Sequence, residues 1–288
     1  MKYTNTKIKM DCRINCLQIN LHKSRVPSAQ LNDRLEEIVF ITEPVTVNGK
    51  VKCCNIQNAR VLAGDHPHRV RAALRLHQDL FPWLVEEFTD EDMCTAAVTI
   101  EGKLVYVCSL YLDITFEARK SLFVKLIDWC DSKRIPLVIG ADCNAHSVLW
   151  GCDESNPRGE ALEDLLLTKN LTVMNVGNTP TFSRLGAESI IDITVMNGIS
   201  LEKLNLSDWE VLTESSLSDH RYVKYCLGQY IPKKKMYRNL HKADWNVFKL
   251  HLDKSELPKI AEDGSNIDDC AMALEMLISE GMNKSCPM

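Results

Sequence analysis

The chain has 288 residues, of which 45% are hydrophobic and 25% charged, the proportions of a folded globular protein. Its net charge of −5 does not mark it as a nucleic-acid binder, but most of the excess acidic residues lie after His241. The part of the chain before His241 is nearly neutral, and such a protein can bind DNA where its basic residues cluster. No apolar run approaches the roughly 20 residues that cross a bilayer, and no signal-peptide pattern opens the chain, so we expect an intracellular protein without membrane contact.

The cysteine pattern argues against disulfides and zinc. None of the twelve cysteines forms a Cys-x-x-Cys pair, and most lie within apolar runs, as Cys108 does in VYVCSLYL. We therefore expect reduced, buried side chains that act as small hydrophobic residues.

Apolar periodicity predicts many strands with a few helices between them. Strands are predicted over residues 13–20, 38–42, 70–77, 95–100, 104–112, 136–142, 171–176, 181–184, 190–196, 209–213 and 220–228. Helices are predicted over residues 30–40, 115–133, 160–170, 244–252 and 267–281. This pattern suits an α/β protein in which two mixed sheets pack face to face with helices outside.

Two local patterns add detail. Residues 70–77 alternate between apolar and basic side chains, which predicts a half-buried strand. Glu101-Gly102-Lys103, between two apolar stretches, predicts a hairpin turn.

A basic, proline-containing stretch, IPKKKMYRN, begins at Ile231 and predicts a linker. We expect one domain over residues 1–230. Residues 231–288 then form a linker and a short helical tail, too small for a core, that leads to a further domain.

Several predicted strands end on polar side chains rather than on turn residues. These positions are Asn20, Glu43, Tyr111, Asp142, Asn144, Asp192, Asp219 and His220. Each alone has a plain structural explanation: an Asx turn, a solvated strand end, a helix cap or a core tyrosine. Their shared position at strand ends indicates one site.

The residue types suit metal-assisted phosphodiester hydrolysis. Magnesium takes oxygen ligands and keeps several waters, so one or two carboxylates hold it. A separate carboxylate activates water, and a histidine held by a carboxylate stabilises charge on the phosphate. Glu43, Asp142 and the pair Asp192 and His220 are candidates for these three roles.

These residues, in this order, resemble the endonuclease/exonuclease/phosphatase superfamily, and most closely the endonuclease domain of non-LTR, LINE-type retrotransposons of the Jockey-like group. NAHSVLWG, NTPTF, SIIDIT and SLSDHRYV are similar to motifs of that group, and the resemblance runs from about Arg13 to Gly228. It implies a four-layered α/β sandwich like that of DNase I.

The resemblance implies metal ligands and water activation. Glu43 would be the principal metal ligand, with Asn20 and Asp219 in the metal and phosphate shell. Asp142 would activate the water, and Asn144 would orient Asp142 or the phosphate.

The resemblance also implies phosphate and substrate contacts. His220 would contact the scissile phosphate while Asp192 holds its ring, and Tyr111 would donate to the phosphate. Four more side chains are candidates for substrate binding: Ser218, His146, Arg71 and Arg75.

The chain departs from the family pattern at three places. Cys143 replaces an aromatic residue between Asp142 and Asn144, Leu-Asp-Ile follows Tyr111 where a proline-containing turn is common, and Thr42 replaces a frequent glutamine. None of the catalytic positions is lost.

We therefore expect an endonuclease that depends on Mg²⁺, with Mn²⁺ as an alternative, and nicks double-stranded DNA in the nucleus. The nick would leave a 3′-hydroxyl for a reverse transcriptase that normally follows in the same chain. A basic groove around Arg60, Arg69, Arg71, Arg75 and Arg158 would favour DNA. Two alternatives stay open: a phosphatase or phosphodiesterase of the same fold, and a decayed domain that binds nucleic acid without cutting it.

Overall fold

The computed structural model describes residues 13–66, 69–113, 122–228, 242–255 and 267–286. The chain divides into two compact units, Met1–Ile231 and Pro232–Met288. The linker expected from Ile231 lies outside the described residues, as do residues 115–121 of the helix expected over 115–133.

The first unit contains two six-stranded mixed sheets. In neighbour order the first sheet consists of β15 (Leu206–Val211), β16 (Val223–Leu227), β1 (Ile14–Asn20), β2 (Ile38–Thr42), β6 (Ala72–His77) and β5 (Ala59–Ala63). The second consists of β11 (Leu171–Val173), β14 (Asp192–Asn197), β10 (Leu137–Asp142), β9 (Lys103–Tyr111), β8 (Met93–Ile100) and β7 (Trp83–Leu84). In each sheet one central pair is parallel, β1 with β2 and β9 with β10.

Helices and two small hairpins complete this unit. The helices are α1 (Arg25–Gln30), α2 (Leu122–Lys133), α3 (Pro157–Thr168) and α4 (Gly198–Lys203), with short 3-10 turns η1 (Leu31–Asp33), η2 (Gln78–Leu80), η3 (Glu86–Phe88) and η5 (Val148–Trp150). The hairpins pair β3 (Thr46–Val47) with β4 (Lys50–Val51) and β12 (Phe182–Arg184) with β13 (Ala187–Ser189). Local signals place these elements: α3 starts at an N-cap, Asn156, whose side chain accepts from the amide of Gly159 at 2.7 Å.

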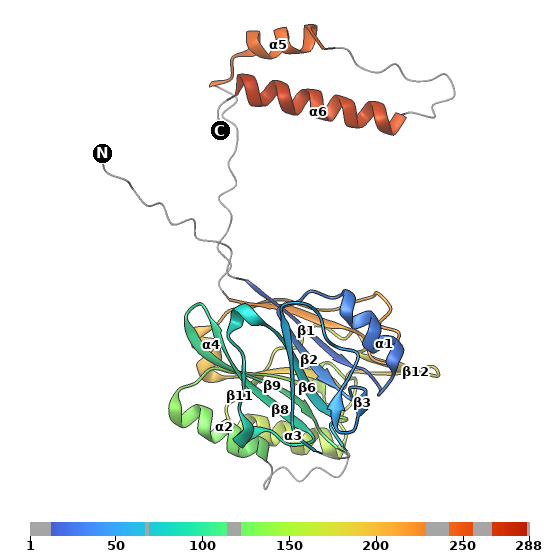
Figure 1. Ribbon diagram of the computed structural model, residues 1–288, viewed down its shortest axis with the longest axis vertical. Coiled ribbons are helices and arrows are strands. Elements are labelled where there is room, and N and C mark those ends of the chain that lie inside the picture. Colours follow the sequence, from blue (N-terminus) through green and yellow to red (C-terminus); the bar gives the residue numbers. More distant parts are fainter. Residues whose placement is uncertain (1–12, 67–68, 114–121, 229–241, 256–266, 287–288) are drawn as a thin grey trace, which may run out of the picture. The chain divides into compact units, whose positions relative to one another are not determined.

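Three apolar clusters define four layers. One cluster fills the space between the sheets, with Phe40 and Tyr225 from the first sheet against Val107 and Val138 from the second. Another joins the outer face of the second sheet to α2 and α3, which Figure 1 shows along that face. The third lies on the outer face of the first sheet, which Leu31 of η1 covers. The predicted α/β sandwich is confirmed.

Gly140 in β10 lies directly against the opposite sheet. A Cβ atom there would lie 2.8 Å from Cβ of Phe40, so the glycine makes room for the opposite sheet. Beside it, the buried Gln18 of β1 crosses between the sheets and donates to the carbonyl of Ile193 at 3.0 Å. A buried amide needs such partners, and this one ties the two sheets together next to their polar edge.

The structure confirms some local predictions and corrects others. The hairpin turn at Glu101-Gly102 is present, with positive φ at both residues, as a tight turn between β8 and β9 requires. The helix predicted over residues 30–40 is wrong, because α1 ends at Gln30, only the short turn η1 follows, and the chain then enters β2 at Ile38. The prediction that residues 70–77 form a half-buried strand is also wrong, because every residue of β6 except His77 is buried.

The second unit is a helical hairpin of α5 (Trp245–Asp253) and α6 (Ile267–Ser285). Asp244 caps α5, and Gly281 lets α6 approach, since a Cβ there would lie 2.8 Å from the ring of Phe248. Across the described parts of the chain, no helix combines the length and apolarity needed to cross a bilayer.

Candidate active site

Four of the expected site residues reach one place because they share a side of the strands. Asn20 ends β1, Tyr111 ends β9, Asp142 ends β10, and Asp192 begins the antiparallel β14. Side chains alternate between the two faces of a strand. Each of these four residues is an even number of positions from a residue packed between the sheets, so it lies on the same inner face. Tyr111, Asp142 and Asp192 also lie on one rung, as Asp142 pairs with both.

Asn20 connects the two sheets. Its amide nitrogen donates to Oδ2 of Asp142 at 2.7 Å and lies 3.4 Å from Oε2 of Glu43. Its oxygen accepts from the backbone amide of His22 at 2.7 Å. A single amide side chain thereby sets the position of Asp142 relative to Glu43.

Glu43 and Asn144 adopt left-handed backbone conformations, with φ of 46° and 47°. Such conformations are uncommon for residues other than glycine and occur at functional sites, where the surroundings hold them in place. The amide of Glu43 donates to the carbonyl of Arg71, and the Glu43 carbonyl accepts from the amide of Lys23, both at 2.8 Å. Asn144 donates from its backbone to Asp142 at 3.3 Å and from its side chain to Leu112 at 3.3 Å.

His220 and Asp192 form a buried pair, with Nδ1 of the ring 2.8 Å from Oδ2 of the carboxylate. The edge of Phe182 packs against the imidazole, with ring centroids 5.0 Å apart. The hydroxyl of Thr181 accepts from the amides of Ile191 and Asp192 at 3.1 and 3.0 Å, so it holds the start of β14. Burial lowers the pKa of His220, but Asp192 outweighs it by charge and hydrogen bond and raises the pKa to about 9.

The electrostatics of Asp142 and Tyr111 follow from burial beside other acids. Burial, and then the charge of Asp192, raise the pKa of Asp142 to about 7. Burial, and then the charges of Glu43 and Asp142, raise the pKa of the Tyr111 phenol. Ligand atoms of Asp142, Asp192 and His220 all lie within 4.8 Å of one another.

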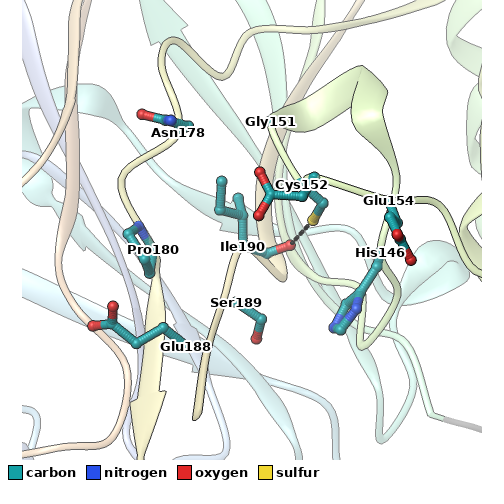
Figure 2. A pocket seen from close by; sticks show the side chains of 10 residues that line it. His146, Gly151, Cys152, Glu154, Asn178, Pro180, Glu188, Ser189 and Ile190 are labelled. Carbon is teal, nitrogen blue, oxygen red and sulfur yellow. Dashed lines mark hydrogen bonds between the residues drawn. The ribbon is translucent and has the colours of Figure 1, made fainter. Parts of the chain in front are cut away.

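These side chains face a cavity of about 330 Å³. Its lining includes Asn20, Glu43, Tyr111, Asp142, Asn144, His146, Asp219 and His220. Asp192 lies behind His220 and is not part of the lining. A second cavity of about 460 Å³ shares His146 and Ser189 with the first, and Figure 2 shows it between the Gly151–Glu154 turn and the strand that leads to Ile190.

The donor set around Glu43 and Asp219 fits a hard cation. Nζ of Lys23 lies 2.9 Å from Oε1 of Glu43, and Nδ1 of His22 lies 3.4 Å from Oδ2 of Asp219. Each of the two carboxylates is thus paired with a basic side chain. Carboxylate and amide oxygens of this kind are what magnesium selects.

The arginines of the expected basic groove are all bonded to other groups of the protein. The side chain of Arg75 is almost fully buried and donates to the carbonyls of Leu31 and Arg34, both at 2.7 Å, away from the site. Arg71 is buried as well and is bonded to the carboxylates of Asp92 and Asp113. Both were expected to bind substrate; in this structure their guanidinium groups are buried and bonded to protein oxygens.

The remaining candidates also have protein partners. Arg60 donates to the carbonyl of Pro82 at 3.3 Å and Arg69 pairs with Asp113 at 3.1 Å. Arg158 donates to the carbonyls of Leu112 and Cys143 beneath the site. The hydroxyl of Ser218 donates to the carbonyl of Asn20, the last residue of β1, at 2.8 Å.

Sequence reasoning did not single out several side chains that shape the site. His22 and Lys23 follow Asn20 directly, and two bases after a polar strand end were an available signal. Thr181 and Phe182 lie within the NTPTF stretch, but their contacts with Asp192 and His220 depend on the fold.

The chain is similar to known proteins over much of the sandwich. Residues 105–224 match the family described as endonuclease-reverse transcriptase. The chain is 30% identical over 156 residues to the RNA-directed DNA polymerase from mobile element jockey of Drosophila melanogaster, covering 52% of this chain and 16% of that protein. It is 25% identical over 223 residues to the putative 115 kDa protein in type-1 retrotransposable element R1DM of the same species, covering 72% of this chain and 21% of that protein.

Among solved structures, the endonuclease domain of TRAS1, a telomere-specific non-LTR retrotransposon, superposes with a TM-score of 0.61 at 24% identity. The match covers 74% of this chain and 97% of that domain. The chain therefore spans about a fifth or less of its two curated relatives, but nearly the whole of the solved domain.

Proposed function

We propose that this chain is a magnesium-dependent endonuclease of the endonuclease/exonuclease/phosphatase superfamily that nicks double-stranded DNA. Its similarity to the jockey and R1DM proteins and to the solved TRAS1 endonuclease domain supports the proposal. The observation that carries the proposal is the convergence of Glu43, Asp142 and the His220–Asp192 pair at one cavity. The nick would leave a 3′-hydroxyl from which a reverse transcriptase copies, at chromosomal DNA in the nucleus.

Glu43 would hold Mg²⁺, or Mn²⁺ in its place, with Asn20 and Asp219 in the same shell. The cation supplies charge that offsets the phosphate and helps the leaving oxygen depart. Lys23 and His22, which pair with Glu43 and Asp219, mark where positive charge is favoured. Asn20 would turn its amide oxygen toward the cation or keep its present bond to Asp142.

Asp142 would take the proton from the attacking water. A pKa of about 7 suits this role, because a base is most effective when its pKa lies near the working pH. Asn20 and the backbone of Asn144 each donate to one of its oxygens, which keeps the carboxylate aimed into the cavity.

His220 would stabilise the negative charge that develops on the phosphate. With a pKa of about 9 its ring is protonated at neutral pH, and Asp192 holds the ring by Nδ1 so that Nε2 is the nitrogen left for the phosphate. Tyr111, also in the lining, would donate a hydrogen bond to another phosphate oxygen. Contacts to phosphate carry no base information, so His146 and the neighbouring cavity are where target preference would arise.

Residues 231–288 would connect this domain to the reverse transcriptase of the polyprotein. The division of the chain near Ile231 supports this assignment. It leaves the endonuclease domain over residues 1–230.

The test is nicking of supercoiled plasmid by the purified full chain with Mg²⁺ and with EDTA. We expect nicking only with the metal, and a loss of about 100-fold or more in Glu43→Gln, which keeps the size of the side chain but removes its charge. Glu210→Gln is the matched control, because Glu210 is exposed on β15 and should tolerate the change.

Three outcomes would contradict the proposal. DNA binding without any nicking would indicate a non-catalytic binding domain, and hydrolysis of small phosphoesters without nicking would indicate a phosphatase. Equal activity in Glu43→Gln and Glu210→Gln would remove Glu43 as the metal ligand.

A further inference from the structure

Arg71 lies just before β6 and makes an unusual set of contacts for a residue so close to the cavity. Its guanidinium bonds both carboxylate oxygens of Asp92 through Nε and Nη2, and Oδ2 of Asp113 through Nη1. The Arg71 side chain is 6% exposed, whereas those of Asp92 and Asp113 are 28% and 25% exposed. Paired carboxylates of this kind hold a guanidinium in one orientation.

The backbones of the same two residues hold two residues of the site. The carbonyl of Arg71 accepts from the amide of Glu43, and the carbonyl of Asp92 accepts from the amide of Tyr111, both at 2.8 Å. Glu43 follows β2 in the first sheet and Tyr111 ends β9 in the second. The Arg71–Asp92 salt bridge therefore joins the segments that hold Glu43 and Tyr111, beside a backbone bond from the amide of Arg71 to the carbonyl of Glu91 at 2.6 Å.

The guanidinium also contacts the ring of Tyr111 directly. Cζ of Arg71 lies 4.5 Å from the ring centroid, within the range of a cation–π contact. Because Asp92 and Asp113 hold the guanidinium, the guanidinium in turn restricts the ring. Its positive charge also opposes the rise in the phenol pKa that burial and the nearby carboxylates cause.

We propose that Arg71 is a positioning residue of the nicking reaction, which acts through Tyr111 and does not bind DNA. The inference rests on the proposed function. To reach a phosphate, Arg71 would have to give up its bidentate pair with Asp92 and its bond to Asp113, and breaking the ion pairs of a buried guanidinium is strongly unfavourable. Holding the Tyr111 phenol at the correct distance from Glu43 would instead raise the nicking rate, because small misplacements at a reacting centre slow the reaction severely.

Two substitutions separate the parts of this role. Arg71→Met removes the charge and all three carboxylate bonds, while Arg71→Lys keeps the charge but cannot make the bidentate pair with Asp92. The backbone carbonyl that anchors Glu43 is present in both variants. The matched control is Arg75→Met, because Arg75 is an equally buried arginine of the same strand region whose bonds lie away from the site.

The experiment measures the single-turnover nicking rate, the dissociation constant for uncut DNA in EDTA and the thermal midpoint, each with and without Tyr111→Phe. We expect Arg71→Met to lower the rate about 10-fold or more with unchanged DNA affinity. Arg71→Lys should recover part of that rate. In the Tyr111→Phe background the Arg71→Met loss should largely disappear, and Arg75→Met should lose stability but keep its rate per folded molecule.

The following outcomes would contradict the inference. Weaker DNA binding at an unchanged rate would make Arg71 a DNA-binding residue, and a rate loss that persists in full in Tyr111→Phe would make its role purely structural. If Arg71→Met behaves like Arg75→Met while the parent chain nicks DNA, the inference alone fails. If the parent chain does not nick DNA with Mg²⁺, the proposed function fails and takes the inference with it.

Discussion

At the scale of single residues, the pair of Asp192 and His220 shows how a carboxylate can keep a buried imidazole protonated. Burial by itself favours a neutral imidazole, and the carboxylate at 2.8 Å reverses that preference. Since the folded-state pKa of about 9 lies above the ordinary 6.5, protonation stabilises the fold fully below pH 6.5. That contribution is lost as the pH rises through about 9.

Asp192→Asn should therefore lower the pKa of His220, measured by NMR titration of the imidazole, because burial is then no longer opposed by the charge of the partner. The variant should also nick more slowly with little change in DNA binding, since the lost interaction matters most as charge develops on the phosphate. An unchanged pKa in the variant would show that Asp192 does not control the ring.

His220→Ala should reduce the nicking rate by roughly 10² to 10⁴, as removal of other acid–base or oxyanion-stabilising groups does. Because the two residues act as a unit, the double variant should be little worse than His220→Ala alone. Nicking rates and thermal midpoints of the three proteins test this. Full activity in a folded His220→Ala protein would rule out the nuclease mechanism as proposed.

At the scale of elements, the site depends on how closely β10 and β2 approach. Gly140 lies two residues before Asp142 on the same face of β10, directly against Phe40. The distance between the sheets at this point therefore also sets the distance between Asp142 and Asn20, which bond across the gap.

Gly140→Ala should destabilise the protein by about 1–3 kcal/mol, the usual cost of adding a methyl group to a filled core. The new Cβ would lie 2.8 Å from Phe40 and 3.0 Å from Oε1 of Gln18, and both side chains are buried. Chemical denaturation gives the change in the free energy of unfolding. Phe40→Leu in the same chain keeps Cβ and Cγ, the two atoms of Phe40 that the new methyl group would meet, so it should not recover the loss. Full recovery would show that the clash does not lie at these atoms.

At the scale of the whole molecule, the two units differ in what they bury. The first has three apolar clusters within and around its two sheets. The second is a helical hairpin whose described helices leave several large apolar side chains exposed, among them Trp245, Leu250, Met272 and Met276.

A chain that ends at Ile231 should keep its nicking rate and its thermal midpoint, because the proposed catalytic residues and their supporting bonds all lie within the first unit. The comparison is with the full chain at equal concentrations of folded protein. Loss of both solubility and activity in the shortened chain would show that residues 232–288 pack on the sandwich.

The amino-acid sequence by itself determined the fold class and the set of polar strand ends. Apolar runs that finish on Asn20, Tyr111 and Asp142 predict both the strands and the shared parity of those side chains, because alternation along a strand is a local property. The hairpin at Glu101-Gly102 is local in the same way, since its turn needs residues that tolerate positive φ.

Only the tertiary structure decided which side chains are free to act. A basic residue that alternates with apolar ones in the sequence predicts a side chain that faces solvent or DNA. Arg71 instead has its partners 21 and 42 residues away, and Arg75 donates to a carbonyl 44 residues away. The contacts of Lys23 with Glu43 and of Thr181 with Asp192 likewise join segments that no local pattern connects. Periodicity depends on neighbours in the chain, whereas the partner of a charged or polar group depends on which distant strands the packed core brings beside it.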